Sequence, residues 1–494
     1  MIGPARDALA AAVLILWVPA VVALFRALGP ARASLVAILG GLLFLPRVQL
    51  PVGMLPFDKR VATGLGLILG VLCLDIRSWT RARPRWLDLP MALYVAIPLA
   101  GLALGDRAAT RDSVDSFAQR LLGWAVPYAI GRLYFGDADG PRRVAVGIVL
   151  AGLAYVPVCL YEEFAGPDRY LSTLIYGTHF VEGQVDRLGG FRPEGFLQDG
   201  LQLASWMALA STTAVWLWLG PAHRSSRVPI WLAAPALILT TISCRGVYGL
   251  ITLACGIVSA LATRAFRTRL ALVALAVVPI AYMATRASGL WDGRALDRAA
   301  VLMGRPGTVG FRLDAEDEVI GRVLRQAPAF GFGNYVWHSA EPIRWPDGQW
   351  LQILWSGGLF GLAVAVVGLH GYPAARALAQ PRRRPTAAEA ASPPWALACW
   401  AVLALGEMLH NNSVLGVSGL VAGSIVAASF DPKAPAARAG RSRGAAPTAR
   451  AASYIPLVVT VAILLIVEVL GRLPRPGGPA RPPESSAQPT RSSP

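Results

Sequence analysis

Long apolar segments recur along almost the whole chain of 494 residues. A helix that crosses the ~30 Å hydrocarbon core of a bilayer needs about 20 apolar residues, and backbone groups in lipid must pair within their own segment. The sequence therefore predicts an all-α, polytopic integral membrane protein with about 12–14 transmembrane helices. The candidate segments are Ala8–Leu28, Ala33–Leu45, Val61–Leu74, Leu87–Leu104, Ala118–Phe135, Val144–Phe164, Leu201–Leu219, Val228–Ile242, Gly246–Thr263, Leu270–Thr285, Trp350–His370, Trp395–Leu409, Val414–Ser429 and Ile455–Leu470.

The composition supports this class of protein and excludes several others. Hydrophobic residues make up 55% of the chain and charged residues only 15%, whereas soluble domains carry about 25% charged residues. A soluble enzyme, a secreted disulfide scaffold and a disordered chain are therefore excluded. The cysteines are isolated and form no CxxC pair, so we expect neither a structural zinc site nor a disulfide framework.

The excess of positive charge has a topological explanation. There are 46 Lys+Arg residues against 29 Asp+Glu residues, a formal net charge of +17. In a soluble protein this excess would favour nucleic-acid binding. Here most arginines lie in connections between apolar segments, where cytoplasmic loops gather positive charge. We therefore expect no nucleic acid among the partners and place the basic connections in the cytoplasm, namely 77–85, 142–143, 224–227, 264–269, 376–384 and 433–450.

This orientation also predicts how the chain is divided. The expected parts are N-terminal transmembrane helices (1–164), an extracytoplasmic loop (165–200), transmembrane helices (201–285), a large extracytoplasmic loop with short helices (286–349), C-terminal transmembrane helices with basic cytoplasmic loops (350–471) and a disordered tail (472–494). Strict alternation puts both termini outside, so either Ala33–Leu45 does not span on its own or a terminal segment is miscounted. The two outside loops are the most informative parts, because long loops with little structure of their own are often functional.

Two arginines stand at the outer ends of apolar segments. Arg192, in the segment FRPEGFLQDGLQLA, follows a Gly-Gly pair and precedes a proline, so a stiff turn presents its guanidinium. Arg245, in TISCRGVYGL, lies between two apolar segments near the outer membrane face. An ionisable residue so close to hydrocarbon is a functional hypothesis by default, although an arginine that snorkels to the interface is the other reading.

The segment 310–335, GFRLDAEDEVIGRVLRQAPAFGFGNY, predicts an amphipathic helix with Arg312 at its start. Its apolar stripe is suited to lying on the membrane, and consists of Leu313, Val319, Ile320, Val323 and Leu324. We interpret the acidic run that follows Arg312 as a solvated face rather than a metal site; it comprises Asp314, Glu316, Asp317 and Glu318. Beyond the helix, a Gly-Phe-Gly turn at 331–333 allows close approach of the backbone.

The segment 347–362, DGQWLQILWSGGLFGL, begins with an acid at the start of a membrane helix. Asp347 is first of all an ordinary N-cap, and the functional alternative is a carboxylate held at the membrane boundary beside the arginines. We assign Trp350 and Trp355 to the interfacial aromatic belt. Trp337 and Trp345, in the preceding loop, are left open between the belt and stacking on a sugar ring.

These segments, in this order, carry a resemblance to a known family. Arg192 with Gly195, the CRG of Arg245, the Gly-x-Arg of Arg312 followed by PAFGFGNY, and WLQILWSGGLFGL together resemble the O-antigen ligase and O-antigen polymerase superfamily. The resemblance covers roughly residues 192–362, and its most specific part is the spacing of Gly358 and Gly361.

The resemblance implies an integral-membrane, metal-independent glycosyltransferase with no cofactor. Its donor would be a glycan on undecaprenyl pyrophosphate, its acceptor a hydroxyl of a glycan, lipid or protein, and its location the bacterial inner membrane with the active site facing the periplasm. The pyrophosphate would be bound by Arg192, Arg245 and Arg312, and membrane lipids would surround the protein. Guanidinium groups suit this role because they pair bidentately with phosphate oxygens.

The chain departs from the family's pattern at one position. The His-Asn pair of the ligases, whose histidine is their proposed base, falls on Asp347-Gly348. Asp347 is our candidate catalytic residue there, with Arg245 and Arg312, and His338 is a possible substitute beside Trp337 in the substrate-binding loop. The choice between ligase and polymerase stays open. A transporter or flippase of lipid-linked sugars is the alternative function, and the lack of an internal repeat argues against it.

Overall fold

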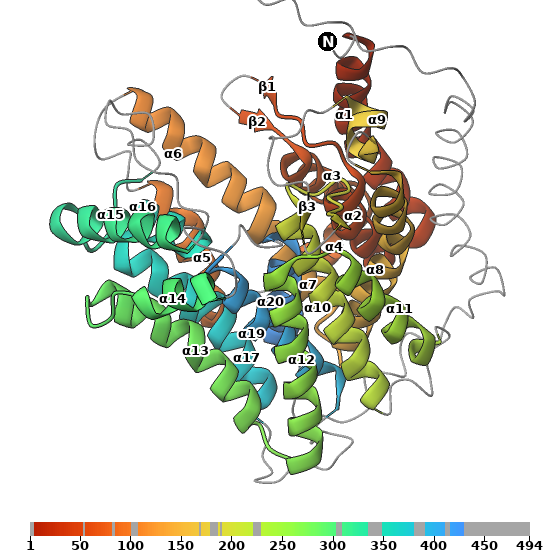
Figure 1. Ribbon diagram of the computed structural model, residues 1–494. Helices are drawn as coiled ribbons and strands as arrows, with labels where there is room; N and C mark the ends of the chain where they lie inside the picture. The colour runs from red at the N-terminus through yellow and green to blue at the C-terminus, as the bar shows by residue number, and fades with distance from the viewer. Residues whose placement is uncertain are drawn as a thin grey trace, which may run out of the picture. The chain divides into compact units, whose positions relative to one another are not determined.

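The computed structural model describes residues 4–52, 55–81, 84–99, 107–166, 169–177, 186–187, 190–220, 229–302, 309–333, 348–379, 391–410 and 415–428 (Figure 1). All of these residues belong to one unit, Met1–Gly440. The second unit, Arg441–Pro494, lies outside the described residues, and so does the predicted disordered tail.

Helices make up nearly all of the described chain, with two short antiparallel strand pairs. In the first half, the helices are α1 (Pro4–Leu28), α2 (Pro30–Phe44), α3 (Lys59–Leu74), α4 (Ile76–Arg81), η1 (Trp86–Asp88), α5 (Leu89–Ala96), α6 (Arg107–Arg120), η3 (Leu121–Ala125), α7 (Val126–Tyr134), α8 (Gly140–Ala165), α9 (Leu171–Tyr176) and α10 (Gly200–Leu219). In the second half, they are α11 (Ile230–Ser243), α12 (Val247–Phe266), α13 (Leu270–Ala287), α14 (Arg294–Leu302), α15 (Gly310–Gln326), α16 (Gln349–Ala363), η7 (Val364–Gly371), α17 (Tyr372–Leu378), α19 (Pro393–Glu407) and α20 (Leu415–Ala427). The strands are β1 (Leu50–Val52) with β2 (Leu55–Phe57), and β3 (Asp186–Arg187) with β4 (Gly190–Phe191).

The predicted fold class, an all-α polytopic membrane protein, is confirmed. Among the described residues, five helical segments are long and apolar enough to cross a membrane, namely Asp7–Leu28, Gly140–Ala165, Val247–Phe266, Leu270–Ala287 and Gln349–Leu378. Four further apolar helices are shorter, namely Pro30–Phe44, Trp86–Leu99, Ile230–Ser243 and Gly416–Ala427. The number of transmembrane helices, about 12–14, stays a prediction.

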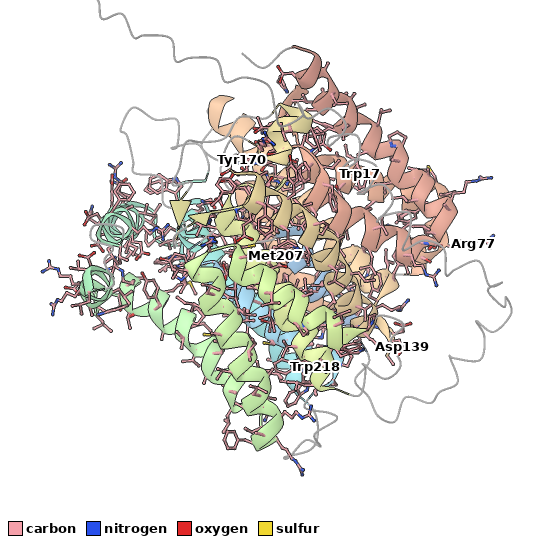
Figure 2. All side chains as sticks on the ribbon, turned by 45° about the vertical axis from the view of Figure 1, so that its right-hand side comes forward. Trp17, Arg77, Asp139, Tyr170, Met207 and Trp218 are labelled. Carbon is pink, nitrogen blue, oxygen red and sulfur yellow. The ribbon has the colours of Figure 1, made fainter. Side chains whose placement is uncertain are left out.

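Helix α10 is the most enclosed long helix, with α8, α11, α12 and α19 packed around it. Met207, labelled in Figure 2, is fully buried in it. Small residues allow the close approach: a Cβ added to Gly249 of α12 would lie 2.8 Å from Ala204, and one added to Gly256 would lie 2.4 Å from Thr212. Such small-residue contacts replace the hydrophobic drive that is missing between helices in lipid.

The assignment of Trp350 and Trp355 to an interfacial belt is wrong. Both side chains are almost completely buried in a cluster that α13, α15 and α16 share. The reason is that α15 packs on α16 and covers this face with protein. Val319, Ile320 and Val323 of the α15 stripe lie in the same cluster, and Leu313 is buried as well, so the stripe contacts protein rather than lipid.

Two of the basic connections, 264–269 and 376–384, meet at one end of the helices, where α10 also ends. The Arg264 side chain, near the end of α12, donates to the carbonyl oxygen of Leu219 at the end of α10. Arg269, at the start of α13, donates to the carbonyl oxygen of Leu378 at the end of α17 at 3.2 Å. The outer loops of the sequence prediction lie at the opposite ends of α10 and α13, whereas a short turn from α11 precedes α12. That the basic end faces the cytoplasm stays a prediction.

Candidate functional site

The loop that carries Arg192 is held by the end of α8. One carboxylate oxygen of Glu162 accepts a hydrogen bond from the backbone N–H of Leu171, and the other accepts from those of Glu194 and Gly195, each at 2.8 Å. Glu162 is completely buried. A buried carboxylate is tolerated only when such bonds compensate for lost water, so its three donors fix the loop firmly.

The same loop is fastened a second time next to Gly195. The Tyr155 hydroxyl accepts a hydrogen bond from the backbone N–H of Phe196 at 2.6 Å. The Lys59 ammonium donates to the carbonyl oxygens of Phe196 and Leu42, each at 3.0 Å. Gly195 has a φ of +57°, and a Cβ added there would lie 2.2 Å from the Tyr155 hydroxyl. Only glycine fits between the loop and α8 at this point.

Arg192 is buried against the first residue of α10. A Cβ added to Gly200 would lie 2.4 Å from the Arg192 Nε. Burial lowers the pKa of Arg192, and the carboxylates of Asp199 and Glu194 oppose this shift. Its Nε and Nη2 are buried, and no group in the described part of the chain accepts a hydrogen bond from them. Unpaired buried donors are costly, so this arrangement is suited to an anionic ligand.

Arg245 lies in the turn between α11 and α12. Its φ of +52° is unusual for a residue other than glycine, which marks a locally strained backbone. Its guanidinium forms an ion pair with Glu163 of α8 at 3.3 Å. It also lies over Gly190 of β4, where an added Cβ would be 2.5 Å from the Arg245 Cζ. The Arg245 side chain thus packs within the protein and does not snorkel to the membrane interface. It contacts Gly190, which precedes Arg192 by two residues in the same loop.

Arg312 reaches the first turn of α12 from α15. Its Nη1 donates a hydrogen bond to the Tyr248 hydroxyl at 2.8 Å, and its guanidinium lies 5.4 Å from the centre of the Tyr248 ring. Tyr248 follows Arg245 by three residues, so both arginines contact the beginning of α12.

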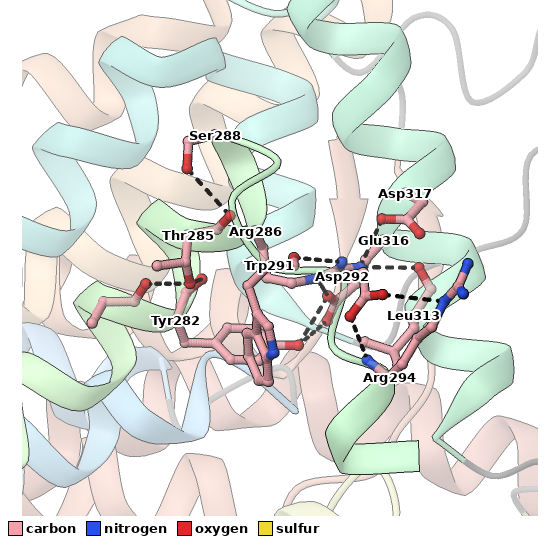
Figure 3. Close-up of polar contacts among 11 residues, drawn as sticks. Tyr282, Thr285, Arg286, Ser288, Trp291, Asp292, Arg294, Leu313, Glu316 and Asp317 are labelled. Atoms are coloured by element: carbon pink, nitrogen blue, oxygen red, sulfur yellow. Dashed lines mark hydrogen bonds and ion pairs between the residues drawn. The ribbon is translucent and has the colours of Figure 1, made fainter. Parts of the chain in front are cut away.

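A buried ionic network holds α15 in the position that makes this contact (Figure 3). The Arg286 guanidinium at the end of α13 binds Glu316 at 2.9 Å, Asp317 at 2.8 Å and the carbonyl oxygen of Leu313 at 3.2 Å. The Tyr282 hydroxyl donates to the Glu316 carboxylate. The interpretation of the acidic run as a solvated face is therefore wrong for Glu316, which is buried because Arg286 neutralises it. Asp317 remains exposed.

The N-terminal ends of α10 and α12 meet at the centre of this arrangement. A Cβ added to Gly246 would lie only 2.3 Å from the Cβ of Ala204, so the two helix ends are in direct contact. Helix N-termini carry a partial positive charge and favour anions. The structure brings the three arginines of the sequence prediction to these two ends: Arg192 to α10, and Arg245 and Arg312 to α12.

The remaining predicted residues cannot be placed. Asp347, His338 and Trp337 lie outside the described residues, as does Trp345. Helix α16 begins at Gln349, with Gly348 as its N-cap. The described segment therefore begins one residue after Asp347, the candidate base.

His410 belongs to the site, although the sequence analysis did not single it out. Its ring stacks on the Tyr248 ring with centroids 4.0 Å apart and an angle of 16° between the planes. It follows α19, and the preceding Met408 accepts a hydrogen bond from the backbone N–H of Trp350 at 3.1 Å. The available signal was the polar run His-Asn-Asn directly after an apolar segment.

Arg47 is a second residue of the site that the sequence analysis missed. Its guanidinium lies 3.7 Å from the Glu194 carboxylate, at the edge of the Arg192 loop. Burial lowers the pKa of Arg47, and Glu194 is the largest opposing influence. The positive charge of Arg47 thereby offsets the negative charge of Glu194, one of the acids near Arg192.

Comparison with protein-family models, with curated proteins and with solved structures finds no match to this chain.

Proposed function

We propose that the protein is a membrane glycosyltransferase of the O-antigen ligase or polymerase type, which takes a glycan from undecaprenyl pyrophosphate. The observation that carries the proposal is the meeting of Arg192, Arg245 and Arg312 at the N-terminal ends of α10 and α12. The buried, unpaired N–H groups of Arg192 support it further, since a pyrophosphate would supply the acceptors that they lack.

The proposed reaction is a displacement at the anomeric carbon. The acceptor oxygen bonds to the sugar C1 while the bond from C1 to the pyrophosphate oxygen breaks, and the pyrophosphate leaves with the electron pair. Fixed guanidinium groups and helix N-termini at this partly buried site stabilise the negative charge that develops on the leaving group. Arg245 and Arg312 are the proposed catalytic cations, and Arg192 holds the donor.

The membrane setting fits such a donor. Helices α12 and α13 diverge from the short turn that joins them (Figure 1), and both present exposed apolar side chains, among them Val258, Val277 and Val278. A polyprenyl chain in the bilayer would lie along such helices while its pyrophosphate reaches their ends. We place the site on the periplasmic side of a bacterial inner membrane.

A lysine substitution tests the arginine site. Arg245→Lys keeps the charge but loses the planar fork, so we expect transfer from undecaprenyl-pyrophosphate-linked glycan in proteoliposomes to fall by about 10²-fold. Arg267→Lys is the matched control, because Arg267 also has a positive φ (+48°) and caps the other end of α12. It should transfer at the wild-type rate.

Two outcomes would count against the proposal. One is unchanged transfer by Arg245→Lys. The other is a wild-type protein that makes no glycosidic bond but moves labelled lipid-linked sugar across the bilayer, which would favour the transporter alternative.

A further inference from the structure

We infer that His410 is the base that takes the proton of the acceptor hydroxyl, in place of the histidine that the family resemblance would put at Asp347. The inference rests on the proposed function and deepens it, because it assigns the residue that activates the acceptor. It depends on two contacts in the structure, between the end of α19 and the start of α16 and between the His410 and Tyr248 rings, and the lowered pKa of the imidazole supports it.

The end of α19 lies directly against the start of α16. The backbone N–H of Trp350 donates to the carbonyl oxygen of Met408 at 3.1 Å. A Cβ added to Gly348 would lie 2.8 Å from the carbonyl oxygen of Leu409, so no side chain separates the two segments. The resemblance aligns its His-Asn pair with residues 347–348. His410 therefore directly follows a segment that touches Gly348, the second residue of that pair.

The other side of His410 faces the arginine site. Its ring stacks on Tyr248 at 4.0 Å, and the Tyr248 hydroxyl accepts the hydrogen bond of Arg312 at 2.8 Å. The Tyr248 ring thus contacts both His410 and Arg312, whose guanidinium we propose binds the leaving group. An acceptor hydroxyl bound at the edge of the His410 ring, beside Tyr248, would be held close to the bond to be broken.

The surroundings keep the imidazole neutral and therefore able to accept a proton. Burial and then the positive charge of Arg312 lower the pKa of His410 to about 4. Within the described part of the chain, Tyr248 of α12 stacks on it, Arg312 of α15 acts on it electrostatically, and Glu407 of α19 precedes it by three residues. Glu407 accepts hydrogen bonds from Ser205 and Thr252 instead.

The described part of the chain contains one other histidine, which serves as a contrast. His370 is buried in η7, where its Nδ1 lies 3.1 Å from the carbonyl oxygen of Ala365 and its ring contacts Trp124. The ring nitrogens of His410 have no hydrogen-bond partner within the described ranges, and the side chain is only half-buried. His410 is thus the histidine of the two that an acceptor can reach.

The proton balance of the step is simple. The hydroxyl proton passes to a ring nitrogen of His410 as the acceptor oxygen bonds to C1. The departing pyrophosphate carries the electron pair of the broken bond to the arginines. The imidazolium then returns its proton to water, which its lowered pKa favours.

The test compares His410→Gln with Asp347→Asn in proteoliposomes, with two readouts. The first is transfer at neutral pH, which we expect to fall by about 10²- to 10⁴-fold in His410→Gln and by far less in Asp347→Asn. The second is binding of undecaprenyl pyrophosphate by native mass spectrometry, which should stay within about twofold of wild type in His410→Gln, because a base contributes to the transition state rather than to donor binding.

The pH profile separates a base from a structural residue. Wild-type transfer should decline only on the acid side, well below pH 6.5, where His410 takes up its proton, and the residual rate of His410→Gln should lack this decline. The inference would be overturned if His410→Gln transferred glycan at the wild-type rate, or if this variant no longer bound the donor. A wild-type protein that neither binds undecaprenyl pyrophosphate nor transfers glycan would instead overturn the proposed function itself.

Discussion

The backbone N–H of Phe332 donates a hydrogen bond to the carbonyl oxygen of Trp355 at 2.7 Å, and this bond joins two segments that are far apart in the sequence. Helix α16 is broken at Gly358, where φ is +60° and ψ is −161°. The loop after α15 enters the break: Leu359 donates to the carbonyl oxygen of Pro328 at 2.9 Å, and Phe360 donates to that of Ala329 at 3.1 Å. The loop thereby satisfies helix amides that the break leaves without partners.

Replacing Gly358 with alanine should destabilise the protein. The backbone conformation there is essentially restricted to glycine, and a Cβ would lie 2.4 Å from the carbonyl oxygen of Ala329. We expect a loss of about 1–3 kcal/mol, seen as a lower thermal midpoint of the detergent-solubilised protein. Gly406→Ala, in α19, is the control, because nothing lies within 4 Å of its added Cβ. Equal midpoints for the two variants would contradict this account of the break.

The two acids bound to Arg286 should differ sharply in their contribution to stability. The Glu316 side chain is 8% exposed and that of Asp317 is 63% exposed. Glu316→Gln leaves Arg286 buried without its enclosed partner and should cost about 3 kcal/mol. Asp317→Asn removes a solvent-screened pair and should cost less than about 1 kcal/mol. Thermal unfolding of both variants measures the difference, and a larger effect for Asp317→Asn is the contrary result.

Glu162→Gln should loosen the loop that carries Arg192. An amide nitrogen cannot accept a hydrogen bond, so at least one of the three backbone N–H groups loses its partner at a cost of about 1–3 kcal/mol. Hydrogen exchange should accelerate at the amides of Leu171, Glu194 and Gly195. Tyr155→Phe is the matched control, because it frees only the amide of Phe196. Unchanged exchange at Glu194 and Gly195 would show that Glu162 does not hold this loop.

The Glu194 carboxyl should make stability depend on pH. Burial raises its pKa from 4.5 to about 7, and the guanidinium of Arg47 offsets only part of the effect. The folded state therefore holds this proton where the unfolded chain has released it. Stability should fall as the pH rises from 4.5 to about 7, by at most about 1.4 kcal/mol per pH unit.

Glu194→Gln removes this titration. The thermal midpoint of the variant should vary less with pH than that of the wild type across this window, so the difference between the two proteins narrows or reverses towards neutral pH. A wild-type protein that gains stability relative to Glu194→Gln as the pH rises would mean that the paired, ionised form is the one that folding favours.

Several features of the protein could be predicted from the sequence. The apolar segments predict helices because unpaired backbone groups are too costly in lipid, and this holds whatever the helices contact. Arg192, Arg245 and Arg312 could be selected because a charge beside an apolar segment is costly and needs a reason. The structure places all three at the ends of α10 and α12, while their role in binding a donor stays a proposal.

The burial of particular side chains was decided by the tertiary structure. Lipid tails and protein interiors are about equally apolar, so hydrophobicity does not tell which face of a helix contacts protein. Trp350 and Trp355 are therefore core residues that resemble belt residues in the sequence. Glu316 is buried because Arg286, 30 residues earlier, reaches it.

The contacts of His410 at the candidate site could not be predicted from the sequence either. Its neighbours Tyr248 and Arg312 are distant in the sequence, and only the packing of α19 against α12 and α16 brings them together. The chain by itself determined that helices form and that charges stand at their ends, because these follow from local energies. Which charges meet was decided by packing, because contacts between helices depend on shapes that no single segment contains.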